Sequence, residues 1–328
     1  MSAQPSALHV NEAACTAERM IAEAARRGYA WHYMPKAAAA QEWRGLTGQA
    51  RRSLRGAAWV ARLRGQARRH DIVHVHSAST VAHSKYGAPR YVVHCHGTDV
   101  RTTQYDPARG PGIRAALRDA EAVFFSTPDL AEHVLPHRPD AHYVPAPVDV
   151  ANVPRWAPEG PPRVVFASRW TADKNTDTQL ATAAGLAKAL AGRAEVAGLD
   201  WGPHADAAAD AGVVLLPRRD HAGYLELLAG AHVVVGQAAG ILAVSELEAL
   251  AAGAPMVVPV GLPLYAETPP PVHGGSVDDA VAATVALLDG TVAHEPEKVR
   301  QWVADHHGVE HAVDIVAAVH RDVVAARK

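Results

Sequence analysis

The chain has 328 residues, of which 48% are hydrophobic and 20% are charged, a balance that excludes a disordered or fibrous protein. Its length favours two domains, because one hydrophobic core rarely organises more than about 250 residues. With 32 basic against 34 acidic side chains, no general attraction to nucleic acid is expected.

The chain also lacks the usual signs of export or membrane insertion. Its two cysteines, Cys15 and Cys95, are too few for a disulfide framework, and its first ten residues lack the basic start and apolar run of a signal peptide. No apolar stretch reaches the roughly 20 residues that a membrane span requires. We therefore expect a cytoplasmic protein with no integral membrane segment.

In the first half, short apolar runs alternate with stretches of helical periodicity such as residues 17–27. This alternation is typical of βαβ units, in which helices cover both faces of a parallel sheet. It predicts a Rossmann-like domain over residues 1–150, with strands at residues 7–10, 71–76, 90–96, 122–126 and 141–144.

A proline-rich passage then interrupts all periodicity and predicts an interdomain linker over residues 151–162. The alternation restarts in a second Rossmann-like domain, residues 163–305. A packed helix is expected over residues 306–328, and this helix can cross back to the first domain. Ligands of parallel sheets bind outside the carboxyl ends of the strands, so two such domains facing each other are expected to form a binding cleft. The second set of strands is expected at residues 163–167, 195–199, 213–216, 232–235 and 255–259.

Two cations follow the first strand of the second domain. The segment FASRWTADKNTD places Arg169 and Lys174 in a loop before a helix expected to begin near Asn175 or Thr176. Such a loop can hold a diphosphate through charge-assisted hydrogen bonds and the positive end of the helix dipole. The alternative is that both cations are solvated loop charges.

A second motif is the stretch VVVGQAAGILAVSELEALAAGAPMVVPV, in which glycines at 236 and 240 let a ligand approach the backbone. Glu248 near the start of the following helix is suited to accept hydrogen bonds from ribose hydroxyls. However, Ser245 and Glu248 also have the spacing of a capping box, in which Glu248 would only satisfy the amide of Ser245.

Arg169, Lys174 and the run from Glu248 to Pro255 together resemble the donor-site motifs of family 4 retaining glycosyltransferases, which have the GT-B fold. The resemblance implies that Arg169 and Lys174 hold the donor diphosphate and that Glu248 binds the ribose. Gly240 stands where the family has its first carboxylate, so either the sugar contact differs or catalysis is lost. The donor-binding residues implied in this way are Gly202, Gly240, Ile241, Leu242, Ser245 and Glu248.

In the first domain, the segment HCHGTDVR resembles the His-Gly motif that lines the sugar pocket in the same family. The resemblance implies that His96 is catalytic together with Arg169 and Lys174, although a histidine at a strand end more often has a structural role. Asn11, Glu12 and Asp99 are the expected acceptor or sugar-pocket residues. Glu12 is a candidate general base, with a stabilising role in the first helical turn as the alternative.

Four histidines of the first domain form two His-x-His pairs, His74 with His76 and His94 with His96, on strands expected to be adjacent. No carboxylate or cysteine cluster completes a ligand set around them, and the chain contains no Asp-x-Asp motif. We therefore expect no metal site and no cofactor. A basic region with interleaved Trp43 and Trp59 is expected to be a solvated helix face rather than a surface for an anionic acceptor or a membrane, and its arginines are Arg44, Arg51, Arg52, Arg55, Arg62, Arg64, Arg68 and Arg69.

The function expected from the motifs and the resemblance is metal-independent transfer of a hexosyl group, with retention, from a nucleotide-sugar donor to a hydroxyl group of a small molecule, glycan or glycolipid. A nucleotide-sugar 2-epimerase and a catalytically impaired binding or partner subunit are the alternatives. Peripheral contact with the inner membrane face is compatible with a cytoplasmic location. The sequence leaves open the base, the sugar, the acceptor and the oligomeric state.

Overall fold

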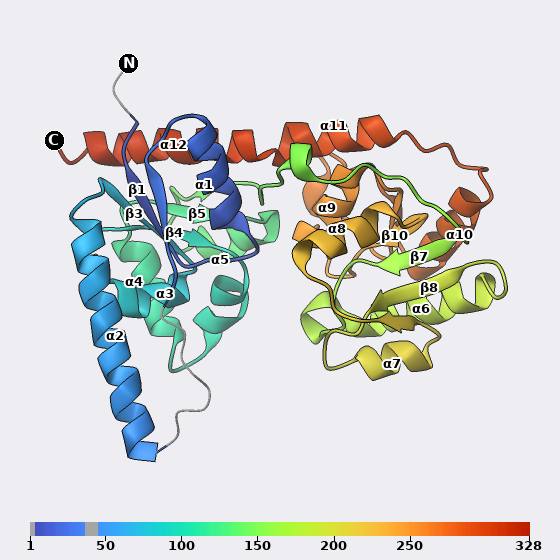
Figure 1. Cartoon of the computed structure of the whole chain (residues 1–328), viewed down its shortest axis with the longest axis horizontal. Coiled ribbons are helices and arrows are strands. Elements are labelled where there is room, and N and C mark those ends of the chain that lie inside the picture. The colour runs from blue at the N-terminus through green and yellow to red at the C-terminus, as the bar shows by residue number, and fades with distance from the viewer. Residues whose placement is uncertain (1–3, 37–44) are drawn as a thin grey trace. The chain divides into compact units, whose positions relative to one another are not determined.

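The computed structural model describes residues 4–36 and 45–328. The chain divides into two compact units (Figure 1). Unit 1 is discontinuous and combines Met1–Pro147 with Val309–Lys328, whereas unit 2 is the continuous segment Val148–Gly308. No helix of the described residues is long and apolar enough to cross a membrane.

Unit 1 is built on a six-stranded sheet in which all the pairings are parallel. The strand order β2-β1-β3-β4-β5-β6 reverses direction between β1 and β3. These strands are β1 (Ala7–Val10), β2 (Trp31–Met34), β3 (Ile72–His76), β4 (Val92–Cys95), β5 (Val123–Phe125) and β6 (His142–Tyr143).

Because side chains alternate along a strand, each face of this sheet has its own core. One face packs residues such as Val75 and Val93 against helices α2 to α5. The other face packs Phe124 against α1 and α12, and α12 comes from the end of the chain. The helices of unit 1 are α1 (Thr16–Arg26), α2 (Gly45–Ala67), α3 (Ala78–Ser84), α4 (Gly110–Asp119), α5 (Ala131–Val134) and α12 (Val309–Ala325).

Unit 2 has a second six-stranded parallel sheet, with the order β12-β11-β10-β7-β8-β9. This is the doubly wound order of dinucleotide-binding domains, and its direction reverses between β7 and β10. The strands are β7 (Arg163–Phe166), β8 (Glu195–Leu199), β9 (Val214–Leu216), β10 (Val233–Val235), β11 (Met256–Val258) and β12 (His273–Gly274).

Helices cover both faces of this sheet, and a core cluster that includes Phe166, Trp170 and Leu186 packs under α6, α7 and α10. The proline-rich segment expected as a linker lies against unit 2, because the backbone of Trp156 and its indole donate hydrogen bonds to Ala252 O and Ala231 O. The helices of unit 2 are α6 (Thr176–Ala189), α7 (Ala205–Asp210), α8 (His221–Ala229), α9 (Val244–Ala252), α10 (Val277–Leu288) and α11 (Pro296–His307).

Candidate functional site

Strained backbone marks the carboxyl edges of both sheets. Every non-glycine residue with positive φ in the described part of the chain lies in a loop that follows β1, β3 or β7. Each such conformation costs about 1–3 kcal/mol and tends to persist where function requires it. The three strands flank the two points where strand order reverses, which are the usual ligand positions in such sheets. The strained residues are Asn11, Ala14, Cys15, Ser77 and Asn175.

The loop after β7 carries both cations expected to bind a diphosphate. A short 3-10 turn, Ala172–Lys174, leads to α6, which begins at Thr176 as expected. The Arg169 side chain is 43% exposed and lies 3.3 Å from the Asp173 carboxylate. Arg169 therefore stays accessible at the strand end, beside the start of a 14-residue helix.

Lys174 ties this loop to the loop after β10. Its carbonyl oxygen accepts a hydrogen bond of 3.2 Å from the Ala238 amide, and the Asn175 side chain donates to Ala238 O at 3.2 Å. The Lys174 ammonium also acts on Glu246, which is fully buried. Burial raises the pKa of the Glu246 carboxyl, and the positive charge of Lys174 counteracts that rise. Lys174 is thus the cation that accompanies a buried carboxyl group.

The capping box expected at Ser245 and Glu248 is not formed, because Glu246 alone caps the start of this helix. Helix α9 begins at Val244, so Ala243 is its N-cap residue and Glu246 occupies the third helical position. The Glu246 carboxylate accepts hydrogen bonds from the amides of Ala243, at 2.9 Å, and Gln237, at 3.2 Å. The expectation was wrong because it placed the helix start two residues too late, and Glu248 is consequently not used as a cap.

Glu248 is 3% exposed and bonds with a histidine that the sequence did not single out. Its Oε1 lies 2.7 Å from Nε2 of His221, the first residue of α8, whose side chain is 49% exposed. Tyr224 lies near the same group, since Glu246 and Glu248 contribute to raising the pKa of its hydroxyl, after the larger effect of burial. A ligand hydroxyl that binds Glu248 must therefore share its carboxylate with the half-exposed His221 or displace that side chain.

The loop between β10 and α9 is held by hydrogen bonds on both sides of Gly240. Gln237 donates to Ile241 O at 3.0 Å, the Tyr265 hydroxyl accepts from the Leu242 amide at 3.1 Å, and Ser245 donates to Glu246 at 3.2 Å. Gly240 has a φ of +73°, and a Cβ there would meet no heavy atom closer than 4.0 Å. The missing carboxylate therefore leaves open space at this position, not a blocked one.

Gly202, which follows β8, is required by close backbone packing. A Cβ at this position would lie 2.3 Å from the carbonyl oxygen of Trp170, and the φ of +123° is strained for any other residue. The adjacent Trp201 is 42% exposed. The guanidinium groups of Arg218 and Arg169 lie over its ring, at 4.6 and 6.0 Å from the ring centroid.

We expect Gly202→Ala to destabilise unit 2 by about 3 kcal/mol or more, because backbone strain and a collision with an immovable carbonyl add together. Urea unfolding of the variant measures this loss. Gly192→Ala is the matched control, since Gly192 also has positive φ, +71°, but no atom within 4 Å of the added Cβ. Equal stability losses in the two variants would show that the contact with Trp170 is unimportant.

In unit 1, Asp99 organises the loop after β4. Its carboxylate accepts hydrogen bonds from the amides of Ala78 at 2.8 Å, Gly97 and Val100 at 3.1 Å, and His96 at 3.3 Å. The side chain is 4% exposed. The geometry therefore gives Asp99 a structural role beside His96, because contact with a sugar would require it to leave these amides.

The loop after β1 positions its polar residues in two ways. Asn11 donates to His76 O at 3.0 Å and to the Thr80 hydroxyl at 3.2 Å, which joins the loops after β1 and β3. The Glu12 carboxylate accepts from three amides around the start of α1, at 2.7, 2.9 and 3.2 Å. Burial raises the pKa of Glu12 while these amides lower it. This geometry favours the stabilising role of Glu12 over that of a general base.

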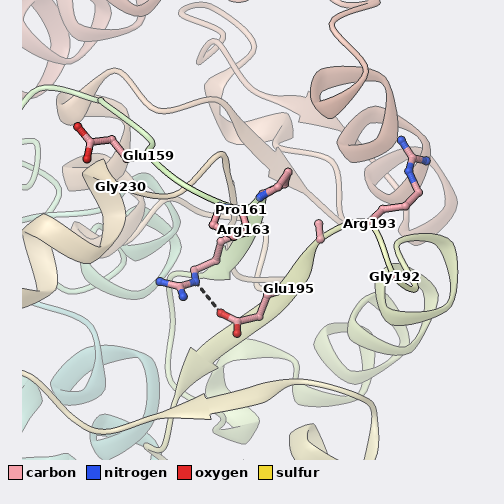
Figure 2. Close-up of a pocket in the computed structure, with 9 residues that line it drawn as sticks. Glu159, Pro161, Arg163, Gly192, Arg193, Glu195 and Gly230 are labelled. Atoms are coloured by element: carbon pink, nitrogen blue, oxygen red, sulfur yellow. Dashed lines mark hydrogen bonds and ion pairs between the residues drawn. The ribbon is translucent and has the colours of Figure 1, made fainter.

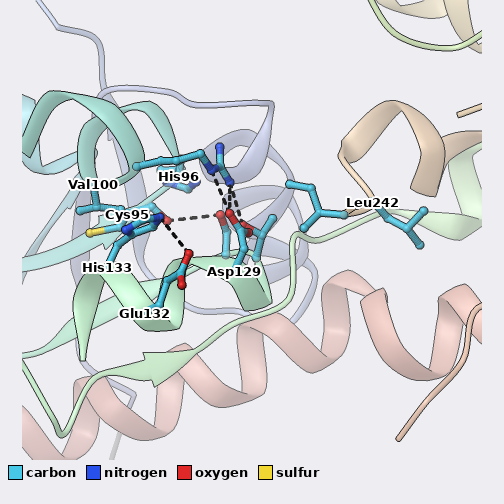
Figure 3. A network of polar contacts seen from close by, with 12 residues as sticks. Cys95, His96, Val100, Asp129, Glu132, His133 and Leu242 are labelled. Carbon is cyan, nitrogen blue, oxygen red and sulfur yellow. Dashed lines mark hydrogen bonds and ion pairs between the residues drawn. The ribbon is translucent and has the colours of Figure 1, made fainter. Parts of the chain in front are cut away.

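An ion pair joins the loops that follow β4 and β5, in which Arg101 donates two hydrogen bonds to Asp129 Oδ2, at 2.6 and 2.8 Å. Within α5, the neighbouring His133 and Glu132 lie 3.5 Å apart (Figure 3). The Tyr105 hydroxyl is 2.8 Å from Nδ1 of His133. Sequence patterns did not indicate these contacts, since their partners lie up to 28 residues apart.

His74 and His76 lie on β3 and His94 lies on the adjacent β4, with His76 opposite His94 as expected, whereas His96 follows β4 in a loop. Two histidines that the sequence did not single out, His9 of β1 and His320 of α12, join the same cluster. Within each of two triplets, one ring nitrogen from every member lies within 4.8 Å of the others; the triplets are His9, His74 and His76, and His76, His94 and His96. Burial lowers the pKa of the whole cluster, which consists of His9, His74, His76, His94, His96 and His320.

A polar pocket of about 400 Å³ in unit 2 lies away from these loops (Figure 2). It surrounds the starts of β7 and β8, where Arg163 and Glu195 form an ion pair of 2.6 Å. Those residues are at the amino ends of the strands, the edge opposite to the one where ligands of such sheets bind. We therefore do not assign the donor site to this pocket.

The basic region is mainly a solvated face of α2, as expected. Its arginines from Arg51 to Arg69 are exposed, whereas Trp59 is 9% exposed and donates to Pro35 O at 2.8 Å. Trp43 and Arg44 lie outside the described residues.

No model of a known protein family matches the chain, and no curated protein matches it in sequence. Solved structures match over nearly its whole length. Sucrose-phosphate synthase from Thermosynechococcus elongatus has a TM-score of 0.68 and 13% identity, over 98% of this chain and 100% of that one. The Anabaena protein HepE, in complex with UDP and glucose, has a TM-score of 0.64 and 12% identity, over 96% and 98%.

A Listeria monocytogenes protein assigned as a UDP-N-acetylglucosamine 2-epimerase also matches, with a TM-score of 0.59 and 12% identity, over 98% of this chain and 96% of that one. Identities this low establish the fold and nothing further. The fold is the GT-B fold that the sequence motifs predicted, with two Rossmann-like units built on parallel sheets.

Proposed function

We propose that the chain transfers a sugar from a nucleotide diphosphate donor to a hydroxyl acceptor, with unit 2 binding the donor and unit 1 the acceptor. The observation that carries this proposal is the position of Arg169 and Lys174 at the start of α6, beside the strand-order reversal of unit 2. Two fixed cations and a helix N-terminus suit a diphosphate, whose charge increases as it leaves the sugar.

In the proposed reaction, the bond between the anomeric carbon and the diphosphate oxygen breaks while the acceptor oxygen bonds to the same face of that carbon. The acceptor proton passes to the departing diphosphate oxygen, so the configuration is retained. Arg169 and Lys174 stabilise the leaving charge without requiring a metal. Glu248 accepts hydrogen bonds from the ribose, His96 contacts the sugar, and the backbone around Gly240 replaces the carboxylate of related enzymes.

Donor binding is tested by thermal unfolding in the presence of a panel of nucleotide sugars with different bases. A ligand at about 100 times its Kd stabilises the native state by about 2.7 kcal/mol, which corresponds to a rise in Tm of about 5 to 10 °C for a unit of this size. The matching free sugars and nucleoside monophosphates are the controls. If no nucleotide diphosphate sugar raises the Tm more than these controls, the proposal is wrong.

The second candidate is an epimerase, which is favoured only by the structural likeness to the Listeria protein. Incubation of the best donor without acceptor separates the two reactions, since epimerisation changes the sugar in the absence of any acceptor. Donor binding with neither product would instead support a binding subunit, for which the open position at Gly240 gives a reason.

A further inference from the structure

Three histidines form a hydrogen-bonded chain across the sheet of unit 1. Nδ1 of His9 lies 3.0 Å from Nε2 of His76, and Nδ1 of His76 lies 3.0 Å from Nε2 of His96. The three residues come from β1, the end of β3 and the loop after β4. The chain therefore starts in the core and ends at the carboxyl edge of the sheet, where His96 is partly buried.

The protons in this chain must all point the same way. Burial lowers the pKa of His9 to about 3, that of His96 to about 4 and that of His76 well below its usual range. All three rings are therefore neutral near pH 7. A neutral imidazole has one N–H donor and one acceptor nitrogen, so a ring that accepts at one nitrogen donates from the other.

The inner end of the histidine chain decides in which direction its N–H groups point. Nε2 of His9 is buried and has no hydrogen-bond partner among the described residues. A buried N–H without an acceptor is rarer than an acceptor without a donor, which favours a bare nitrogen at this position. The neighbouring ring of Trp31, 5.0 Å away between centroids, offers no acceptor for such a proton, because its indole nitrogen is itself a donor, without a partner among the described residues.

We propose that His9 and His76 are positioning residues that hold His96 in the tautomer with its proton on Nδ1. His9 donates from Nδ1 to His76, and His76 donates from Nδ1 to Nε2 of His96. His96 thus offers an N–H donor at the open end of the chain. On the proposed function, it binds an oxygen of the sugar or acceptor and does not serve as the base that removes the acceptor proton.

The main alternative is that these rings form a metal site, since nitrogens of His76, His94 and His96 lie within 4.8 Å of one another. Both ring nitrogens of His94 are buried and lack partners. However, the His94 and His96 rings are stacked, with centroids 4.4 Å apart and planes 22° from parallel. Lone pairs lie in the ring planes, so these two rings would have to rotate before they could share an ion.

The tautomer is measured directly on the whole, ligand-free chain by long-range ¹H–¹⁵N NMR with ring-labelled histidine. The spectra are recorded at about pH 8, above the ordinary histidine pKa of about 6.5. His96→Gln identifies the His96 signals. We expect the Nδ1–H form of His96 to exceed the Nε2–H form by about tenfold or more, which corresponds to about 1.4 kcal/mol. A majority of the Nε2–H form would overturn the proposal.

An internal standard exists in the same unit. Nδ1 of His70 lies 2.8 Å from the Gln66 carbonyl oxygen, which can only accept, so neutral His70 must carry its proton on Nδ1. Its Nε2 lies 2.9 Å from Nδ1 of His32. The signals of His70 therefore show where an Nδ1–H tautomer appears in this protein.

Two substitutions test the hydrogen-bonded chain of histidines. His9→Leu removes the donor and should let His96 populate the Nε2–H form, whereas His9→Asn keeps an N–H close to the position of Nδ1 and should preserve the wild-type tautomer. If the tautomer of His96 is unchanged in His9→Leu, the proposed histidine chain is wrong. If the variants do not fold, the wild-type spectrum still decides the direction.

Metal analysis of untagged protein completes the test. About one equivalent of a bound transition metal that is lost in His94→Ala would overturn the proposed histidine chain. The NMR measurement needs no donor or acceptor. A correct tautomer combined with no nucleotide-sugar binding would therefore refute the proposed function and leave the histidine chain intact.

Discussion

Lowering the pH from about 7.5 to about 5.5 is expected to destabilise unit 1 by several kcal/mol. Five buried histidines and the partly buried His96 have folded-state pKa values below the ordinary 6.5, with that of His9 at about 3 and that of His96 at about 4. The unfolded chain binds more protons below pH 6.5, so the stability is fully present above that pH and is lost as the pH falls toward the folded values.

The size of the effect follows from the number of groups. Each histidine contributes up to about 1.4 kcal/mol per pH unit below 6.5, against a total stability of about 5–15 kcal/mol for a typical domain. Urea unfolding at a series of pH values measures the total, and hydrogen exchange followed by mass spectrometry locates the loss in unit 1. Urea midpoints that stay constant from about pH 7.5 to 5.5 would contradict the prediction.

His320→Leu gives a quantitative check, because it removes one titrating group from the buried cluster. The proton uptake on unfolding, read from the slope of stability against pH, should fall by about one. The control is His83→Gln, since His83 is an exposed histidine of the same unit. An equal change in slope for both variants would mean that burial is not the cause.

Lys174→Ala is expected to lower the rate of sugar transfer by about 100- to 1000-fold, the usual effect of removing a group that stabilises developing negative charge. Lys188→Ala is the matched control, because Lys188 is exposed on α6 of the same unit. Initial rates with the best donor from the thermal screen measure the effect. Unchanged transfer and donor hydrolysis in Lys174→Ala would refute its proposed role.

The electrostatic effect of Lys174 on Glu246 makes a second variant necessary. Without Lys174, the buried Glu246 carboxyl loses its cation and its pKa rises further, so the single variant should also lose some stability. The double variant with Glu246→Gln removes the uncompensated charge. It should regain stability but not activity, which separates the role in charge stabilisation from the role in folding.

The sequence predicted the sheets better than it predicted the sites. Apolar runs and their spacing indicated two parallel sheets, and the observed β3 and β4 fall within the expected residues 71–76 and 90–96. This succeeded because buried parallel strands need continuous apolar residues, a local property of the chain. The N-terminus of α9 was placed two residues too late, because Ala243 has no capping side chain and Glu246 caps the helix from the third position.

Contacts between distant residues could not be predicted in this way. The pairing of His221 with Glu248 joins residues 27 apart, and that of His74 with His320 joins residues 246 apart. His9 falls within the strand expected at residues 7–10, but no local pattern around His9 or His320 indicates that the two join one cluster. Their role depends on which helix covers which face of the sheet, and only the assembled core shows this.

The discontinuity of unit 1 has a consequence for its synthesis. Helix α12 supplies Val313, Val316 and His320 to the core of that unit, yet it is made after all of unit 2. At about 5–20 residues per second, the ribosome needs roughly 10 to 30 s to make residues 148–308. Throughout that time one face of the first sheet lacks its covering helix, so the core of unit 1 can be completed only after all of unit 2 has been made.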